Sequence, residues 1–580
     1  MNILGIHYGS SDAGICVILP NRKPIAIALE RIDRIKYSGE QTKGWRANYS
    51  SNLKKLIEYC STGLGIEPGE LCVDVVAHTR SSVEDEFFQS LLSPYTKPET
   101  KFVRVNHHMA HACGAFFASP FQDSAILVVD GDGDVPENHL YVKDVAEKQS
   151  LYRGTGNEIT TITKTYGASE IPFGIGWAYE LVTYFLNFGA IGEAGKTMGL
   201  SSYGSGKLFN DFKILKRFAD GEILMDPEFF HWAEWKKWGP EYDLQTGYEI
   251  IRRLSSKFGR VRRPGEELPS EYYDEMAYKV QQELEEAMIE LSHRLYQITH
   301  SKNLCIAGGV GLNCITNKKI WDRTPFEQLF IQPAASDTGL ALGAALYGKH
   351  VISNATDKWT MTNAYLGREY NEKEVKEALA KFNSIKIEYY GEDETNPYFC
   401  SKTPIFVKAA QLLSDGMIVG WFQGSSEYGP RALGHRSILA DPREAKFKDI
   451  MNSKVKHRES FRPFAPSVLH ERAKEYFELD YPSPFMLLAA QAREGMRKKI
   501  PAVIHVDNTA RVQTVTREEN GIYYNLVEEF CKITQVPVLL NTSFNVAGEP
   551  IVETPVDALN TFLKTQIDYL VIHNYLISRV

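Results

Sequence analysis

Two histidines and an aspartate in the first quarter of the chain form a combination suited to metal chemistry. His107 and His111 are four residues apart, which places both imidazoles on one face of a helix. Residues 124–129 are predicted to form a buried strand, so Asp130 follows at its carboxyl end. Two imidazoles and a carboxylate suit a divalent transition metal that keeps open positions for a substrate. A His-x3-His pair is also common by chance, and a helix with solvated or capped histidines is the alternative.

A second carboxylate follows a later strand. Residues 329–332 are predicted to form that strand, and Asp337 lies between it and a helix predicted over 340–348. Asp337 is therefore a candidate fourth metal ligand, and a helix N-cap is the alternative role for an aspartate at this place. His108 points to another face of the first helix, and we predict a structural role for it.

The composition of the chain limits the class of protein that it forms. A length of 580 residues favours two to four domains. The net charge of −8, without a long Lys/Arg run, disfavours a nucleic-acid partner. The cysteines form no Cys-x-x-Cys pair, which argues against zinc fingers and for reduced thiols. No apolar run approaches the ~20 residues that span a bilayer, and we recognise no N-terminal leader, so we expect a cytoplasmic protein without a membrane partner.

The elements that must position these residues are short strands and intervening helices. The first expected elements are strands over 3–6, 15–19 and 24–29, a helix over 53–59 and a strand over 72–78. A long helix is predicted over 270–299. The aromatic and charged segment 209–263 is predicted to be a helical insertion, and packing of its aromatic side chains on one another is more plausible than a site there. The polar stretch 352–363 breaks the pattern, and we place a domain boundary within it.

The first turn and a later loop carry residues that could contact a ligand. Residues 9–14 join two strands and offer backbone N–H groups with the carboxylate of Asp12, a combination that binds phosphate directly or through a metal. Polar hairpin turns are common without such a function. In the glycine-rich loop 189–204, Glu193 and Lys196 would orient a ligand that approaches the backbone closely.

A second glycine-rich loop follows the strand predicted over 303–307. Gly308 and Gly309 begin this loop, and Asn313 stands before the next helix. Such a turn admits a nucleotide whose anionic groups face the helix N-terminus. A tight turn without a ligand is the alternative. We expect both glycine-rich loops to lie beside the candidate metal ligands.

Four cations of the second half stand in turn-like segments, several of them beside Gly or Pro. They are Arg431, Lys456, Arg462 and Arg511. Convergent Arg and Lys side chains suit a compact, multiply charged phosphate ligand. Any single arginine is more often a surface or salt-bridge residue, so this prediction depends on the four together.

Taken together, these motifs resemble the bacterial O-carbamoyltransferases of antibiotic and nodulation-factor biosynthesis, the NodU/CmcH family. The resemblance covers nearly the whole chain. Its most specific pieces are Tyr428-Gly-Pro-Arg-Ala-Leu-Gly-His-Arg-Ser-Ile438, Phe461-Arg-Pro-Phe-Ala-Pro466, and Asn541-Thr-Ser-Phe-Asn545 with Gly548-Glu-Pro-Ile551. It implies an α/β protein, with residues 1–355 forming a TsaD-like domain of the actin and sugar-kinase superfamily and residues 356–580 forming a YrdC-like α/β domain.

The resemblance also implies roles for the residues already described. The implied metal ligands, for iron(II) or another divalent ion, are His107, His111, Asp130 and Asp337. From the two glycine-rich loops, and not from the resemblance, we predict that the adenylate site of the first domain is lined by Glu193, Lys196, Gly308, Gly309 and Asn313. The carbamoyl phosphate pocket would comprise Arg431, Lys456, Arg462, Arg511, Ser543 and Asn545. Lys456-x-Arg458 and Ser543-x-Asn545 look like the K-x-R and S-x-N signatures of YrdC. Arg431 and Lys456 would also act in catalysis.

One departure from the family pattern concerns the general base. Family members usually carry a His-Asp pair in the first turn, and that histidine is a candidate base. Here the pair reads Ser11-Asp12. Asp12 and His7 are the candidate catalytic residues that take its place, and alternation along the strand leaves open which way His7 points.

The implied reaction is ATP-dependent O-carbamoylation. Carbamoyl phosphate and ATP, with Mg²⁺, would form carbamoyl adenylate in the second domain, and the first domain would transfer the carbamoyl group to a hydroxyl of a small metabolite. A homodimer is an open alternative to a monomer. The rival functions are hydrogenase-maturation carbamoylation, which would carry Cys-x-x-Cys zinc fingers, tRNA modification, which would favour a basic surface, and a metal- and nucleotide-binding regulator without turnover.

Overall fold

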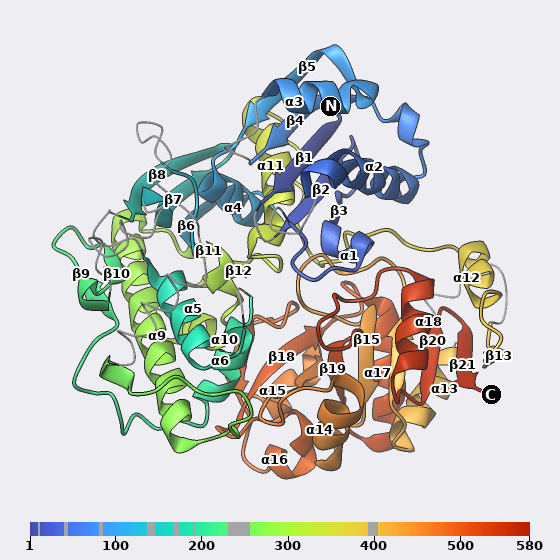
Figure 1. The fold of residues 1–580 in the computed structure, drawn as a ribbon. Coiled ribbons are helices and arrows are strands. Elements are labelled where there is room, and N and C mark those ends of the chain that lie inside the picture. The colour runs from blue at the N-terminus through green and yellow to red at the C-terminus, as the bar shows by residue number, and fades with distance from the viewer. Residues whose placement is uncertain are drawn as a thin grey trace.

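The computed structural model describes residues 1–9, 12–39, 45–79, 85–135, 145–167, 173–189, 192–229, 256–391 and 404–580, with 45–49 and 85–87 as backbone only. The chain forms three large β-sheets, two in its first part and one in its second (Figure 1). Among the described helices, none combines the length and the apolar character needed to cross a membrane.

The two five-stranded sheets of the first part repeat one topology. The first has the order β3-β2-β1-β4-β5 and comprises β1 (Ile3–Tyr8), β2 (Ala13–Ile18), β3 (Ile25–Ala28), β4 (Val73–His78) and β5 (Thr96–Arg104). The second has the order β8-β7-β6-β11-β12 and comprises β6 (Asp123–Val129), β7 (Glu147–Thr155), β8 (Glu158–Tyr166), β11 (Asn303–Ala307) and β12 (Gln328–Ile331). In each sheet the first three strands are antiparallel and the last two run parallel to the first. These mixed sheets, with helices packed on them, confirm the predicted α/β class.

Two helices lie between these sheets. Helix α4 (His107–Phe116) packs on β6 and β11, α11 (Leu340–Tyr347) packs on β1 and β2, and the two helices contact each other. The contact is close because α11 carries Gly343, where an added Cβ would lie 1.9 Å from the carbonyl oxygen of Ala110. A glycine at this position therefore lets the backbones of the two helices approach closely.

The remaining helices of the first part surround the two sheets. They are α1 (Leu29–Asp33), α2 (Trp45–Leu64), α3 (Asp85–Leu92), α5 (Ile175–Phe185), α6 (Ala194–Ser201), α9 (Glu271–Thr299) and α10 (Cys314–Arg323). Helix α2 packs on β2 and β3, and α9 contacts α5, α6, α10 and β6. The predicted helix over 270–299 is thus confirmed as the long helix that supports the second sheet.

The second part of the chain is built on one nine-stranded sheet. Its strands, in sheet order, are β13 (Ile385–Tyr389), β21 (Tyr575–Arg579), β20 (Tyr569–Ile572), β14 (Val419–Phe422), β15 (Arg436–Ala440), β19 (Val538–Ser543), β16 (Ala465–Leu469), β18 (Thr509–Val515) and β17 (Leu488–Gln491). Its helices are α12 (Glu372–Leu379), α13 (Pro404–Ser414), α14 (Lys446–Ile450), α15 (Ala473–Tyr476), α16 (Met496–Lys499), α17 (Gly521–Thr534) and α18 (Pro555–Lys564). Figure 1 shows this sheet below the first two, with α1, α6 and α10 facing it.

The segment 209–263 differs from the predicted helical insertion. Its described residues include an antiparallel strand pair, β9 (Leu215–Arg217) and β10 (Ile223–Met225), so a wholly helical assignment is wrong. Residues 230–255 lie outside the described part of the chain. The expected aromatic packing is present, since the rings of Phe209 and Phe212 pack edge-on against Phe258. Phe258 is buried, so these aromatic side chains fill a core rather than line a site.

Candidate metal centre and cation pocket

The helix that carries both histidines is capped by the residue that precedes it. Helix α4 begins at His107, and the side chain of Asn106, its N-cap, accepts a hydrogen bond from the backbone N–H of Met109 at 3.0 Å. Asp130 directly follows β6, and Asp337 begins the short 3₁₀ helix Asp337–Gly339 before α11. The repeated topology brings these positions together.

The four candidate metal ligands converge on one point. Nε2 of His111 lies 2.8 Å from Oδ2 of Asp130 and 3.6 Å from Oδ1 of Asp337. Nε2 of His107 lies 3.6 and 3.3 Å from the same two oxygens. The four ligand atoms all lie within 4.8 Å of one another, and ligands around one tetrahedral ion of this type are separated by about 3.4 Å. Small side-chain adjustments would bring all four onto a single ion.

The polar atoms at this point are buried and unpaired, which fits a shared cation. Nε2 of His107, Nε2 of His111 and Oδ2 of Asp130 are buried and have no hydrogen bond of acceptable geometry among the described residues. An unsatisfied buried polar group costs about 1–3 kcal/mol, so three that face one another call for a common partner. The Asp337 side chain is 24% exposed, against 2% for His111, so the cluster is open on the side of Asp337.

The close packing of the four side chains also shifts their pKa values. Burial opposes ionisation of Asp337, but the neighbouring His107 outweighs it and holds the pKa of this carboxyl well below its usual value. Burial likewise opposes protonation of His107, and the carboxylates of Asp337 and Asp130 outweigh it and raise the pKa of the imidazole. Both carboxylates are therefore ionised near neutral pH, as metal ligands must be, and His107 has to release its proton when an ion binds.

The candidate bases His7 and Asp12 face the same cluster. The ring of His7 is nearly perpendicular to that of His107, with centroids 6.3 Å apart, and its Nδ1 lies 2.7 Å from the hydroxyl of Thr79. The direction of His7, which the sequence left open, is therefore toward the metal candidates. Burial, followed by the carboxylates of Glu30 and Asp337, raises the pKa of Asp12 well above its usual value. Ser11 lies outside the described residues.

The second glycine-rich loop adjoins the cluster as expected. A Cβ added at Gly309 would lie 3.1 Å from Oδ1 of Asp130, and Gly308 adopts a φ of +87° that favours glycine. Asn313 has a structural task, because its side chain accepts from the backbone N–H of Thr316 as the N-cap of α10 and exchanges hydrogen bonds with Gln281.

Three arginines of the second part form a cation pocket with few counter-charges. Burial and the nearby charges of Arg511 and Arg462 lower the pKa of Arg431. The buried Nε atoms of Arg431 and Arg511 have no hydrogen-bond partner among the described residues. The guanidinium of Arg462 forms a long ion pair with the carboxylate of Glu459, at 3.7 Å. Grouped guanidinium groups with so few anionic partners suit a polyanionic ligand.

Lys456 is a further cation of this pocket. Lys456 is 5% exposed, and its ammonium group donates to Oγ of Ser543 at 3.1 Å and to Oδ1 of Asn545 at 2.6 Å. It also donates to the two backbone carbonyls of these residues. Burial, and then the charges of Arg458 and Arg462, lower its pKa well below the usual value. The structure thus brings Lys456, Ser543 and Asn545 together, as their signatures predict.

Residues of the first part that the sequence analysis missed also border the pocket. The charge of Lys36 contributes to the lowered pKa of Lys456, and Tyr37 lies within electrostatic reach of Arg431. Cys314, the first residue of α10, is buried beside Arg511 and Arg431. The pocket is therefore formed by both parts of the chain. Contacts between residues so far apart in sequence leave no local signal.

The charged residues of the first glycine-rich loop contact the border of the cation pocket. Glu193 forms ion pairs with Lys36 at 3.0 Å and with Lys196 at 3.2 Å, and Lys196 also pairs with Glu459 at 3.2 Å. These partners belong to the border of the cation pocket, and within the described residues neither Glu193 nor Lys196 forms an ion pair with a candidate metal ligand. Gly309 thus lies beside a metal candidate, and the position of Glu193 and Lys196 beside the metal candidates stays a prediction.

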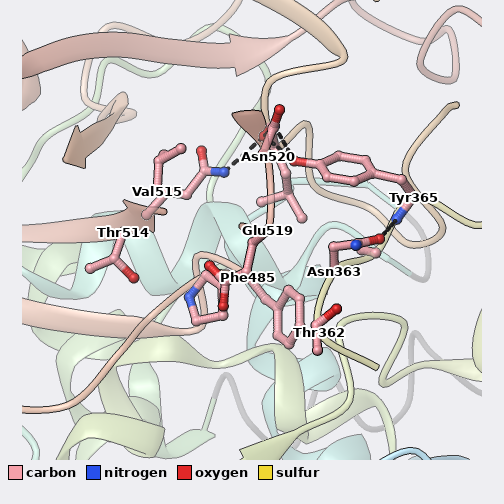
Figure 2. A pocket seen from close by; sticks show the side chains of 12 residues that line it. Thr362, Asn363, Tyr365, Phe485, Thr514, Val515, Glu519 and Asn520 are labelled. Carbon is pink, nitrogen blue, oxygen red and sulfur yellow. Dashed lines mark hydrogen bonds between the residues drawn. The ribbon is translucent and has the colours of Figure 1, made fainter. Parts of the chain in front are cut away.

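A small cavity in the second part of the chain is lined by none of the predicted site residues. Its walls include Thr362, Tyr365, Phe485, Glu519 and Asn520, and Figure 2 shows the amide of Asn520 meeting the hydroxyl of Tyr365 there. Among the described residues that line it there is no arginine or lysine, so it lacks the charge that an anionic substrate would require.

Comparison with known proteins identifies the family. Residues 95–346 match the family model described as carbamoyltransferase N-terminus, and residues 410–579 match carbamoyltransferase C-terminus. Nodulation protein NolNO of Sinorhizobium fredii is 37% identical over 99% of this chain and 81% of its own length. The chain belongs to the carbamoyltransferase family. Nodulation protein NolO of Bradyrhizobium diazoefficiens is a further relative, 34% identical over 82% of this chain and 79% of its own length. The family resemblance and the enzyme class predicted from the sequence are thus confirmed.

Solved structures resemble this carbamoyltransferase only distantly. HypF from T. kodakarensis is 13% identical, covers 62% of this chain and 48% of its own, and gives a TM-score of 0.38. A ROK family glucokinase from Streptomyces griseus is 13% identical, covers 60% of this chain and 98% of its own, and gives a TM-score of 0.28. These scores are too low to support a functional comparison.

Proposed function

We propose that this carbamoyltransferase is an ATP-dependent O-carbamoyltransferase that works in two steps at two sites. Residues 356–580 would supply most of the activation site, and residues 1–355 would supply the transfer site. The observation that carries the proposal is the occurrence, in one chain, of a four-ligand metal cluster and a group of arginines in which the Nε atoms of Arg431 and Arg511 have no hydrogen-bond partner among the described residues. The co-substrates are carbamoyl phosphate and ATP with Mg²⁺, and the acceptor is a hydroxyl of a small metabolite of the antibiotic or nodulation-factor class.

In the first step the cation pocket would hold the phosphate groups. Carbamoyl phosphate loses its phosphate to water, a carbamate oxygen attacks the α-phosphorus of ATP, and pyrophosphate leaves. Arg431, Arg462 and Arg511 would neutralise the charge that grows on the phosphate oxygens, and Lys456 would add a fourth cation. Ser543 and Asn545 hold the Lys456 ammonium in place. The product, carbamoyl adenylate, carries AMP as a good leaving group.

In the second step the acceptor hydroxyl attacks the carbamoyl carbon and AMP leaves. His107, His111, Asp130 and Asp337 would hold a divalent ion, iron(II) by family resemblance, which supplies Lewis-acid polarisation of the carbamoyl group.

Asp12 and His7 are the candidates for the base that takes the hydroxyl proton. Asp12 lies within electrostatic reach of Asp337 and Asp130, so its carboxylate is placed to accept a proton beside the cluster. His7 faces the cluster from the strand β1.

The nucleotide would lie where the glycine-rich loops and the cation pocket meet the cluster. Gly308 and Gly309 leave room for the backbone approach of the adenylate beside Asp130. Glu193 and Lys196 would act from the side of the pocket, next to Lys36. Asn313 would contribute through its place at the N-terminus of α10.

The test is product formation with purified protein. Incubation with ATP and carbamoyl phosphate should release pyrophosphate, and elemental analysis should find one divalent ion per chain, retained in Arg431→Met and lost in His111→Ala. Screening hydroxylated metabolites for carbamate formation would then identify the acceptor. A folded protein that releases no pyrophosphate, or a His111→Ala variant that retains its ion, would refute the proposal.

A further inference from the structure

One short segment of the second part contacts both candidate sites. Tyr428 is 3% exposed, and its hydroxyl donates to the backbone carbonyl of Thr338, which directly follows the candidate ligand Asp337. Gly429 lies against the same loop, since an added Cβ would lie 2.9 Å from the carbonyl oxygen of Pro333. The loop that carries Asp337 is thus held from outside its own domain.

The same segment reaches the cation pocket within three residues. Arg431, the central guanidinium of the pocket, follows Gly429 after a proline. Three residues of extended chain span at most about 10 Å. An anion that fixes Arg431 therefore acts on backbone that is continuous, over a short distance, with the contact at Thr338.

The segment is also anchored well enough to transmit a displacement. The backbone N–H of Tyr428 donates to the carbonyl of Ala364 at 2.7 Å, and the guanidinium of Arg31, from α1, donates to the carbonyl of Gly429 at 3.0 Å. On the inner side, Oε1 of Glu427 accepts from three backbone N–H groups at 2.8 to 3.1 Å, those of Leu433, His435 and Arg436.

We propose that Tyr428 is a positioning residue that couples occupancy of the two sites. An anion on Arg431 would hold the segment 428–431 in the position seen here, and the Tyr428 hydroxyl would then hold the Asp337 loop before the ion binds. The ion then loses less conformational entropy on binding, and by linkage the anion binds more tightly when the ion is present. The inference rests on the proposed function, because it takes the two sites as an ion site and a phosphate site. Its consequence is that the transfer site is assembled when the activation site is loaded.

The test measures ion affinity with and without an anion. Metal-free protein is titrated with Co²⁺, followed by visible absorption, in the absence and presence of saturating inorganic phosphate. In the unmodified protein phosphate should lower the Kd for Co²⁺ about fivefold, the lower end of typical couplings. In Tyr428→Phe, which keeps every charge and the ring, this ratio should fall below about twofold, and phosphate itself should still bind.

Two controls separate the coupling from other effects. Tyr365→Phe removes a neighbouring hydroxyl, which donates to the carbonyl of Leu433 at 2.8 Å and not to the metal loop, so it should keep the fivefold ratio. Arg431→Met should abolish the phosphate effect and leave Co²⁺ binding.

A fivefold ratio that persists in Tyr428→Phe, or no phosphate effect in the unmodified protein, would overturn the inference alone. Failure of the unmodified protein to bind Co²⁺ or phosphate would instead refute the proposed function, and the inference with it.

Discussion

Replacement of Arg431 by methionine should weaken phosphate binding without weakening the fold. The buried Nε of Arg431 has no partner among the described residues, and its neighbours Arg511 and Arg462 repel it. Removing this cation relieves an unsatisfied donor, so the free energy of unfolding without anion should stay unchanged or rise by on the order of 1 kcal/mol. The lost charge-assisted hydrogen bond costs about 1.5–3 kcal/mol, or roughly 12- to 140-fold in affinity.

A matched arginine should give the opposite result. Arg443 makes a two-pronged ion pair with the buried Asp441, at 2.6 to 3.0 Å, so Arg443→Met leaves that carboxylate short of donors and should lower the free energy of unfolding by about 1 kcal/mol. Urea unfolding with and without inorganic phosphate measures both quantities, because phosphate that binds the native state raises its stability. If Arg431→Met were clearly less stable without phosphate and still stabilised by it, Arg431 would be structural and the pocket would not be an anion site.

Two further predictions concern the metal loop and pH. Gly309→Val should reduce nucleotide affinity and ion content together, because its Cβ would lie 3.1 Å from Oδ1 of Asp130; an unchanged ion content by elemental analysis would count against this placement. Burial lowers the pKa of His435 from 6.5 to about 4, so the unfolded chain binds the proton more tightly and stability should fall as pH decreases from 6.5 toward 4. Protonation of His435 alone should lower the free energy of unfolding by roughly 2 kcal/mol between pH 7 and pH 5. In urea unfolding, the stability of His435→Gln should therefore fall less over this pH range.

The sequence predicted those parts of the site that depend on local patterns. The spacing of His107 and His111 placed both on one helix face, and the apolar runs before Asp130 and Asp337 placed the two carboxylates at strand ends. Turn-like surroundings singled out Arg431 as a pocket residue rather than a solvated one. Each of these inferences uses neighbours within a few residues, which is the range over which sequence patterns carry information.

The parts that sequence reasoning missed depend on contacts between distant segments. Lys36 and Tyr37 border the cation pocket only because α1 faces the second part of the chain. Glu193 borders the same pocket because it forms an ion pair with Lys36. The strands Glu147–Thr155 and Glu158–Tyr166 went unpredicted because β8 is polar and half-exposed, so the pair lacks the apolar runs that mark the other strands. Whether a polar segment pairs in a sheet is decided by its partners, which the local pattern does not contain.

The central claim is the division of labour between the two sites, and separate assay of the two steps tests it most directly. Pyrophosphate release and carbamate transfer should be measured in His111→Ala and in Arg431→Met, each with and without synthetic carbamoyl adenylate. His111→Ala should still release pyrophosphate and should fail to transfer even with the adenylate. Arg431→Met should lose pyrophosphate release and regain transfer when the adenylate is added. Loss of pyrophosphate release in His111→Ala, or failure of the adenylate to restore transfer in Arg431→Met, would contradict the two-site account.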